Sequence, residues 1–273
     1  METAFNASLV LLTILYTILI SSYARIFSRG PAGVALLVRP ILIGTVGLHF
    51  LSVFIRGLSV GACPMSSRAE FLSLVALCVA VNYLLVEVRL GERATGIFAM
   101  TPAFLLQVVA TVSILGAEEL PETRLGAYQS VHILAAIVGL SAVALSNVYA
   151  ILYLFLYTAI KRGRFGLFYR KMPSLETLSD LNFVTTSGAF CSLSVVIALG
   201  LWKAFDGDTR TAVGLDQPEV LLTSLLWLLF GVSLFAKRFL NLGSKRFAYT
   251  TLLSLILLVG LFVGGLFAPG FHG

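Results

Sequence analysis

The sequence predicts an all-α polytopic membrane protein, built as a single bundle of eight transmembrane helices with both termini outside. The first observation is composition: 58% of the residues are hydrophobic and 12% are charged, against about 45–50% and about 25% in soluble domains. The second is that apolar stretches of about 20 residues, enough to cross a hydrocarbon core, recur along the whole chain. An unpaired backbone amide costs several kcal/mol in lipid, so these stretches are predicted to be helices rather than strands.

The apolar segments follow one another with no connection long enough for a soluble domain. In the first half of the chain they cover residues 7–23, 34–55, 71–86 and 97–115. In the second half they cover residues 128–160, 183–205, 220–236 and 247–267. We therefore expect residues 1–273 to form one transmembrane domain.

The first segment is predicted to be a retained helix with its N-terminus outside, not a cleaved signal peptide. A signal peptide carries its positive charges before the apolar run. Here Glu2 precedes the run, whereas Arg25 and Arg29 follow it.

Basic residues give an independent prediction of orientation, because they are retained on the cytoplasmic side of a membrane. The loops after odd-numbered segments, with their flanks, hold thirteen of the nineteen lysines and arginines: Arg25, Arg29, Arg89, Arg93, Lys161, Arg162, Arg164, Arg170, Lys171, Lys237, Arg238, Lys245 and Arg246. The opposite side has Arg56, Arg68, Arg124, Lys203 and Arg210, and Arg39 lies inside the second segment. Both termini are thus expected outside. These short loops also account for the net charge of +6, so no nucleic-acid partner is expected.

Polar residues inside the segments are interpreted as packing features. Asn82, Gln107 and Asn147 are expected to form hydrogen bonds between helices. Before the sixth segment, Thr177 and Asp180 have the spacing of a helix cap. The cysteines are Cys63, Cys78 and Cys191. They form no CxxC pair, and the two within helices are expected to be small buried residues rather than metal ligands.

The three histidines, His49, His132 and His272, all fall on the predicted outer side of the membrane. Neutral imidazole is the commonest metal ligand, and an ionisable residue within a membrane is a functional candidate. A structural zinc site would need four nitrogen or sulfur ligands. Two imidazoles on facing helices in an apolar bundle suit haem instead, because its iron takes two axial ligands. A histidine that only satisfies a hydrogen bond at the interface is the alternative interpretation for each.

Four stretches resemble the CcsA-type cytochrome c assembly family, and especially its eight-helix HemX-like and YpjD-like members. They are "VHILAAIVGLSAVALSNVYAILYL", "MPSLETLSDLNFVTTSGAFCSLSVVIALGLW", "DQPEVLLTSLLWLLFGVSLFAKR" and "FVGGLFAPGFHG". "LIGTVGLHFLSV" is similar to the second helix of the shorter members. The resemblance implies that His132 and His272 are the axial ligands of a haem b near the outer face. It leaves His49 as an alternative ligand or as a residue that supports the site.

The chain also departs from the family pattern. The external loop keeps Asp216, Pro218 and Glu219 of the family's haem-contacting segment, but no tryptophan lies between Trp202 and Trp227. Glu219 is equally well explained as an acidic residue in the first turn of a helix. Where the family has a further histidine near the end of the seventh helix, this chain has Phe235.

The expected function is haem binding in the inner membrane of a bacterium, for cytochrome c maturation or haem supply. No catalytic carboxylate pair or nucleophile triad is present, so the chain would be at most a non-hydrolytic subunit of a haem lyase system. The resemblance implies a second membrane subunit or apocytochrome c as partner. One alternative is a HemX-like regulator or scaffold of haem biosynthesis that acts through the basic loop of residues 161–171. Another is a subunit of a larger electron-transfer complex.

Overall fold

A computed structural model of the protein describes residues 2–30, 33–60, 67–91, 93–117, 126–205 and 218–267. Within these ranges the chain forms helices joined by short turns, with no strand, which confirms the all-α class. The helices are α1 (Glu2–Arg29), α2 (Ala35–Val60), α3 (Arg68–Leu90), α4 (Gly96–Leu115), α5 (Ala127–Lys161), α6 (Leu167–Lys171), α7 (Leu175–Phe205), α8 (Pro218–Phe239) and α9 (Ser244–Phe267).

Seven of the described helices are long and apolar enough to cross a membrane, namely α1 to α5, α7 and α8. Each coincides with one of the first seven apolar segments of the sequence. The protein is therefore a multi-pass helical membrane protein. The eighth segment, residues 247–267, lies within α9. A membrane span by α9, and the location of both termini outside, stay predictions.

The chain divides into two compact units. Unit 1 comprises Met1–Val131 and Phe165–Pro173, and so contains α1 to α4 and the short α6. Unit 2 comprises His132–Arg164 and Ser174–Gly273, and so contains nearly all of α5 together with α7, α8 and α9. The uniform succession of apolar segments did not indicate this division.

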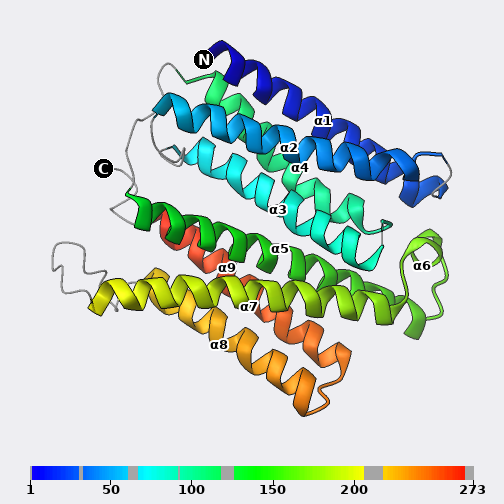
Figure 1. Cartoon of the computed structure of the whole chain (residues 1–273). Helices are drawn as coiled ribbons and strands as arrows, with labels where there is room; N and C mark the ends of the chain where they lie inside the picture. The colour runs from blue at the N-terminus through cyan, green and yellow to red at the C-terminus, as the bar shows by residue number, and fades with distance from the viewer. Residues whose placement is uncertain are drawn as a thin grey trace. The chain divides into compact units, whose positions relative to one another are not determined.

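The four long helices of unit 1 pack in a ring, since α1 and α3 each contact both α2 and α4. Figure 1 shows these helices side by side. The interior is filled by large side chains that are fully buried: Leu9, Leu12, Tyr16, Leu19, Tyr23, Leu42, Leu77, Tyr83 and Met100. The short α6 joins this unit through Phe168, whose ring centroid lies 6.3 Å from that of Phe98 in α4.

Unit 2 is organised around an apolar core to which all four of its helices contribute. The buried members are Ala142, Val143, Ala189, Leu193, Leu226, Phe230 and Leu258. Beside this core, Phe190 stacks on Trp227 with ring centroids 5.5 Å apart. Trp227 Nε1 donates a hydrogen bond to Ser194 Oγ at 2.8 Å, which satisfies the polar atom of the indole.

Local sequence sets both ends of α3. Ser67 Oγ accepts the Glu70 N–H at 3.0 Å, and the Glu70 carboxylate accepts the Ser67 N–H at 3.2 Å. This reciprocal capping box satisfies two backbone donors at the helix start. The helix ends at Gly91, whose φ of 69° is the left-handed conformation that favours glycine.

The start of α7 corrects one expectation. The helix begins at Leu175, two residues after Pro173, and not near residue 183. Ser174 Oγ accepts the Thr177 N–H at 3.1 Å, so Ser174 is the capping residue. The prediction that Thr177 and Asp180 form the cap was wrong, because the first polar residue after the proline already supplies it.

The cysteines divide between the two environments of a membrane helix. Cys78 is buried, as expected, whereas Cys191 is exposed on α7, and that part of the prediction was wrong. Lipid is as apolar as the interior of the bundle, so a small apolar side chain gains little from facing inward. Cys63 lies outside the described residues.

Candidate functional site

The three candidate histidines have different positions in the chain's architecture. His49 lies on α2 in unit 1 and is fully buried. His132 lies on α5 at the first residue of unit 2 and is half-buried. His272 lies outside the described residues.

Both ring nitrogens of His49 are engaged within unit 1. Its Nδ1 lies 3.2 Å from the hydroxyl of Tyr16 on α1, and its Nε2 lies 3.0 Å from the hydroxyl of Ser73 on α3. The Tyr16 and His49 rings also meet edge to face, with centroids 5.9 Å apart. The imidazole is therefore held by one helix on each side.

The direction of these hydrogen bonds follows from the contact between Ser73 and Gln107. Ser73 donates its single hydroxyl proton to Gln107 Oε1 at 3.0 Å, so toward His49 it must act as an acceptor. His49 Nε2 then carries the proton, and Nδ1 is an acceptor for the Tyr16 hydroxyl, which also lies 3.4 Å from the Ala76 carbonyl oxygen. This assignment describes a neutral imidazole in the Nε2–H tautomer, derived from the network.

The network continues through α4 and returns to α1. Gln107 Nε2 donates to Thr111 Oγ1 at 3.1 Å, and Thr111 lies 3.0 Å from Thr13 Oγ1. Thr13 in turn donates to the Leu9 carbonyl at 3.0 Å. We call the six residues from Tyr16 through His49, Ser73, Gln107 and Thr111 to Thr13 the His49 chain. To ligate a metal, His49 would have to give up one of its two hydrogen bonds in this chain.

Next to the His49 chain lies a cavity of about 20 Å³, which holds no more than a water-sized molecule. Ser73 and Ser52 line it, together with the ion pair between Arg56 Nε and Glu70 Oε1 at 2.7 Å. Glu70 is the same residue that caps α3. It thus connects the start of that helix to α2.

At the opposite end of the unit 1 helices, the fully buried carboxylate of Glu87 is shared by two arginines. Glu87 Oε1 accepts from Arg39 Nε at 3.2 Å and from Arg93 Nε at 3.1 Å, and Oε2 accepts from the Tyr23 hydroxyl at 2.5 Å. Arg93 also donates to the Ala35 carbonyl at 2.8 Å. We call Glu87, Arg39, Arg93 and Tyr23 the Glu87 cluster.

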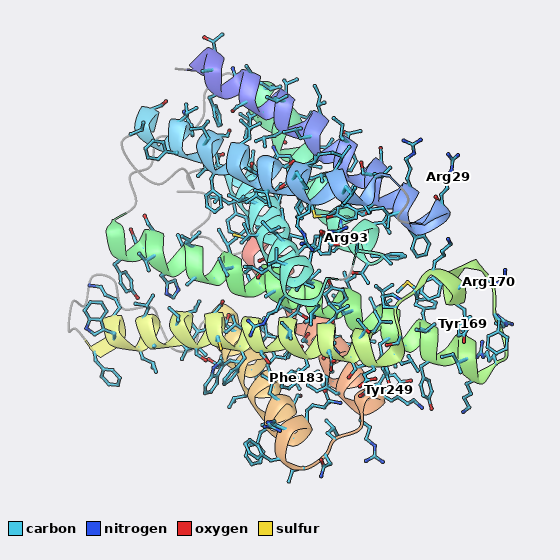
Figure 2. The ribbon with its side chains drawn as sticks, turned by 45° about the vertical axis from the view of Figure 1, so that its right-hand side comes forward. Arg29, Arg93, Tyr169, Arg170, Phe183 and Tyr249 are labelled. Carbon is cyan, nitrogen blue, oxygen red and sulfur yellow. The ribbon has the colours of Figure 1, made fainter. Side chains whose placement is uncertain are left out.

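Figure 2 contrasts Arg93, which lies among the helices of unit 1, with Arg29, whose side chain projects away from the end of α1. Both count among the basic residues predicted on the cytoplasmic side, whereas Glu87 was not among the predicted site residues. A usable signal was present, because Arg39 lies inside the second apolar segment and an intramembrane charge requires a partner.

His132 is held against α7 within unit 2. A Cβ atom at Gly200 would lie 3.9 Å from His132 Cε1, so the imidazole packs beside a position without a side chain. Besides the small cavity in unit 1, a cavity of about 260 Å³ lies in unit 2, and no histidine lines either one.

The remaining candidate residues differ in how far they are exposed. Trp202 on α7 is 64% exposed, whereas Trp227 on α8 is partly buried beside the unit 2 core. Phe235 is exposed and packs against Phe239 with centroids 4.9 Å apart. Pro218 and Glu219 are the first two residues of α8, but their side chains, and all of Asp216, lie outside the described part.

No group of three or more histidine, cysteine, aspartate or glutamate residues that could hold a metal ion occurs among the described residues. Comparisons with family models, with curated proteins and with solved structures found no match to this chain. What the fold and the sites define is a class: a multi-pass helical membrane protein of two compact units, with buried polar networks in unit 1.

Proposed function

We propose that this protein binds haem b in a bacterial inner membrane, in the manner of the cytochrome c assembly family that it resembles, with His132 and His272 as axial ligands. The observation that carries the proposal is the contrast between two histidines. Both nitrogens of His49 are committed to the His49 chain, whereas His132 is a half-buried imidazole at the beginning of a unit. This contrast favours a supporting role for His49 among its two alternatives.

Bound haem would supply a redox-active iron and the vinyl groups to which apocytochrome c thiols are attached. The chain's own residues would bind and orient it. His132 would present a neutral imidazole beside Gly200, where the absence of a side chain leaves space for the ring. Asp216, Pro218 and Glu219, with Trp202 of α7, would contribute to docking. A second membrane subunit would share the task.

The test is an absorption spectrum of the protein purified in mild detergent. A b-type Soret band is expected, and His132→Ala and His272→Ala should each weaken it severely. His49→Ala should keep the band, because that side chain supports unit 1 rather than the iron. A loss of the band in His49→Ala with the other two variants unaffected would show that the ligands are wrongly assigned.

A matched pair of glycine variants on α7 sharpens the test. Gly200→Leu fills the position beside the His132 ring, whereas a side chain at Gly188 meets nothing within 4 Å. We expect Gly200→Leu to shift or weaken the Soret band and Gly188→Leu to leave it unchanged. A colourless wild-type protein that still associates with its membrane partners would instead favour a regulator or scaffold.

A further inference from the structure

The cavity of about 260 Å³ in unit 2 lies where α5 and α8 end and where α7 and α9 begin. Its lining is polar and carries charges of both signs. The lining residues are Tyr153, Leu175, Glu176, Ser179, Asp180, Lys237 and Ser244. The haem proposal uses none of them.

One side of the cavity is built on the hydroxyl of Ser244. Ser244 Oγ accepts hydrogen bonds from Ser179 Oγ and from Lys237 Nζ, each at 2.8 Å. Its own proton is left to interact with the Tyr153 hydroxyl, which lies beside it. The ammonium of Lys237 also lies 5.9 Å from the Phe247 ring centroid, so this positive charge is held in place.

The other side carries two carboxylates from α7. Glu176 and Asp180 are one helical turn apart and therefore on the same face, and both are exposed at the cavity. Within the described residues neither carboxylate forms an ion pair or a hydrogen bond, although Asp180 acts electrostatically on Lys237. The cavity thus presents a cation with hydroxyl groups on one side and negative charge on the other.

The depth of the cavity corresponds to the headgroup region of a bilayer. The 31 residues of α7 make a helix about 46 Å long, which exceeds a hydrocarbon core of about 30 Å. The apolar segment 183–205 begins after Glu176 and Asp180, so the first turns of α7 are the part expected to extend among the headgroups. Lys237 lies in the last turn of α8, and Ser244 is the first residue of α9.

We propose that this cavity binds the headgroup of a phosphatidylethanolamine lipid. The phosphate accepts from the Lys237 ammonium, which has further N–H donors besides the one used by Ser244, and from the Tyr153 hydroxyl, and the primary ammonium of the ethanolamine donates to Glu176 and Asp180. Charge-assisted hydrogen bonds of both signs then form within one small site. A pocket between membrane helices at headgroup depth is a recurring kind of lipid site.

The charge pattern discriminates among lipid classes. Phosphatidylglycerol has the phosphate but no ammonium, so the two carboxylates would face it unpaired. Phosphatidylcholine has a positive charge but no N–H donor for them. A free zwitterion such as O-phosphoethanolamine carries the same phosphate and primary ammonium groups, but it lacks the diacylglycerol and its phosphate is a monoester.

The experiment is native mass spectrometry of the full chain, released from vesicles that contain equal amounts of phosphatidylethanolamine, phosphatidylglycerol and phosphatidylcholine. Phosphatidylethanolamine should remain as the preferred adduct. Lys237→Gln and Asp180→Asn should each reduce its retention about tenfold, the effect of one charge-assisted hydrogen bond. Arg238→Gln removes the same charge from the neighbouring position, outside the cavity, and should leave retention unchanged.

Asp180 is exposed, so Asp180→Asn is expected to fold even if Lys237→Gln does not. Equal retention of the three lipids, or equal losses in Arg238→Gln and Lys237→Gln, would overturn the proposal. Tight binding of O-phosphoethanolamine without a lipid preference would overturn the lipid assignment. The readout is independent of haem, so it stands or falls separately from the Soret band.

Discussion

In unit 1 the buried hydroxyl of Ser73 joins His49 of one neighbouring helix to Gln107 of another. In unit 2 the buried hydroxyls of Thr185 and Thr251 return instead to carbonyls of their own helices, at 2.8 and 3.1 Å. A hydroxyl that bonds to a carbonyl of its own helix keeps that hydrogen bond in any arrangement of the helices. A hydroxyl that bonds to a neighbouring helix keeps it in only one arrangement.

Charge follows the same contrast. Unit 1 encloses the carboxylates of Glu87 and Glu70, each paired with arginine. In unit 2 the fully buried polar side chains of the described residues are serines, threonines and asparagines. The charged side chain that bonds to Ser244, Lys237, lies in the last turn of α8. We infer that buried charges and hydrogen bonds contribute more to the helix register in unit 1, whereas unit 2 relies more on close apolar packing, together with polar links such as Asn147 to Ser254.

The largest expected effect is that of Glu87→Gln. The substitution leaves the guanidinium groups of Arg39 and Arg93 without their carboxylate, and breaking such a pair costs about 3 kcal/mol. Unfolding in detergent mixtures titrated with SDS measures it. Glu176→Gln, at an exposed carboxylate, should change stability by less than about 0.5 kcal/mol. Equal stabilities of the two variants would refute the importance of the Glu87 cluster.

The next effect is steric. A Cβ at Gly96 would collide with the ring of Tyr23 and the hydroxyl of Tyr83, two fully buried side chains, so Gly96→Ala should destabilise by about 2 kcal/mol. At Gly44, on α2, a Cβ meets nothing within 4 Å. Gly44→Ala should therefore be neutral or stabilising through its better helix propensity. The midpoint of thermal unfolding in detergent compares the two, and a tolerated Gly96→Ala would contradict this packing.

A smaller loss is expected for Gln107→Leu, which removes the partner of both Ser73 and Thr111 in the His49 chain. Rotation of the two hydroxyls to other partners replaces only part of the lost hydrogen bonding, so the free energy of unfolding should fall by about 1–2 kcal/mol. Thr101→Ala on the same helix removes a bond to its own Ile97 carbonyl and serves as the control. Denaturant midpoints should separate the variants, and coinciding curves would count against the chain.

The smallest effect is predicted for Thr251→Val in unit 2. Among the described residues its hydroxyl bonds to the Phe247 carbonyl of the same helix, so the change should stay within about 0.5 kcal/mol. Thr111→Val in unit 1, an identical substitution, should cost more because two neighbouring residues bond to that hydroxyl. If both variants unfold at the same denaturant concentration, the contrast between the units fails.

Hydropathy determined the fold class and the positions of seven spans, because the need to satisfy backbone hydrogen bonds in lipid acts on each segment alone. The interhelical roles expected for Gln107 and Asn147 are confirmed by their bonds to Ser73 and Ser254. These succeeded because an amide within lipid has few other partners. The ligand roles of His132 and His272 stay predictions.

Which partner each polar group takes could not be derived in this way. Glu87 is one of many charged residues that flank an apolar segment, and the residues around it in the sequence do not indicate that Arg39 is its partner. Nothing in the sequence likewise places Ser73 beside His49 or Ser244 beside Lys237. The chain by itself determined where it crosses lipid, since that depends on local composition. Only the tertiary structure decided which charges and hydroxyls meet, because those contacts join residues on different helices.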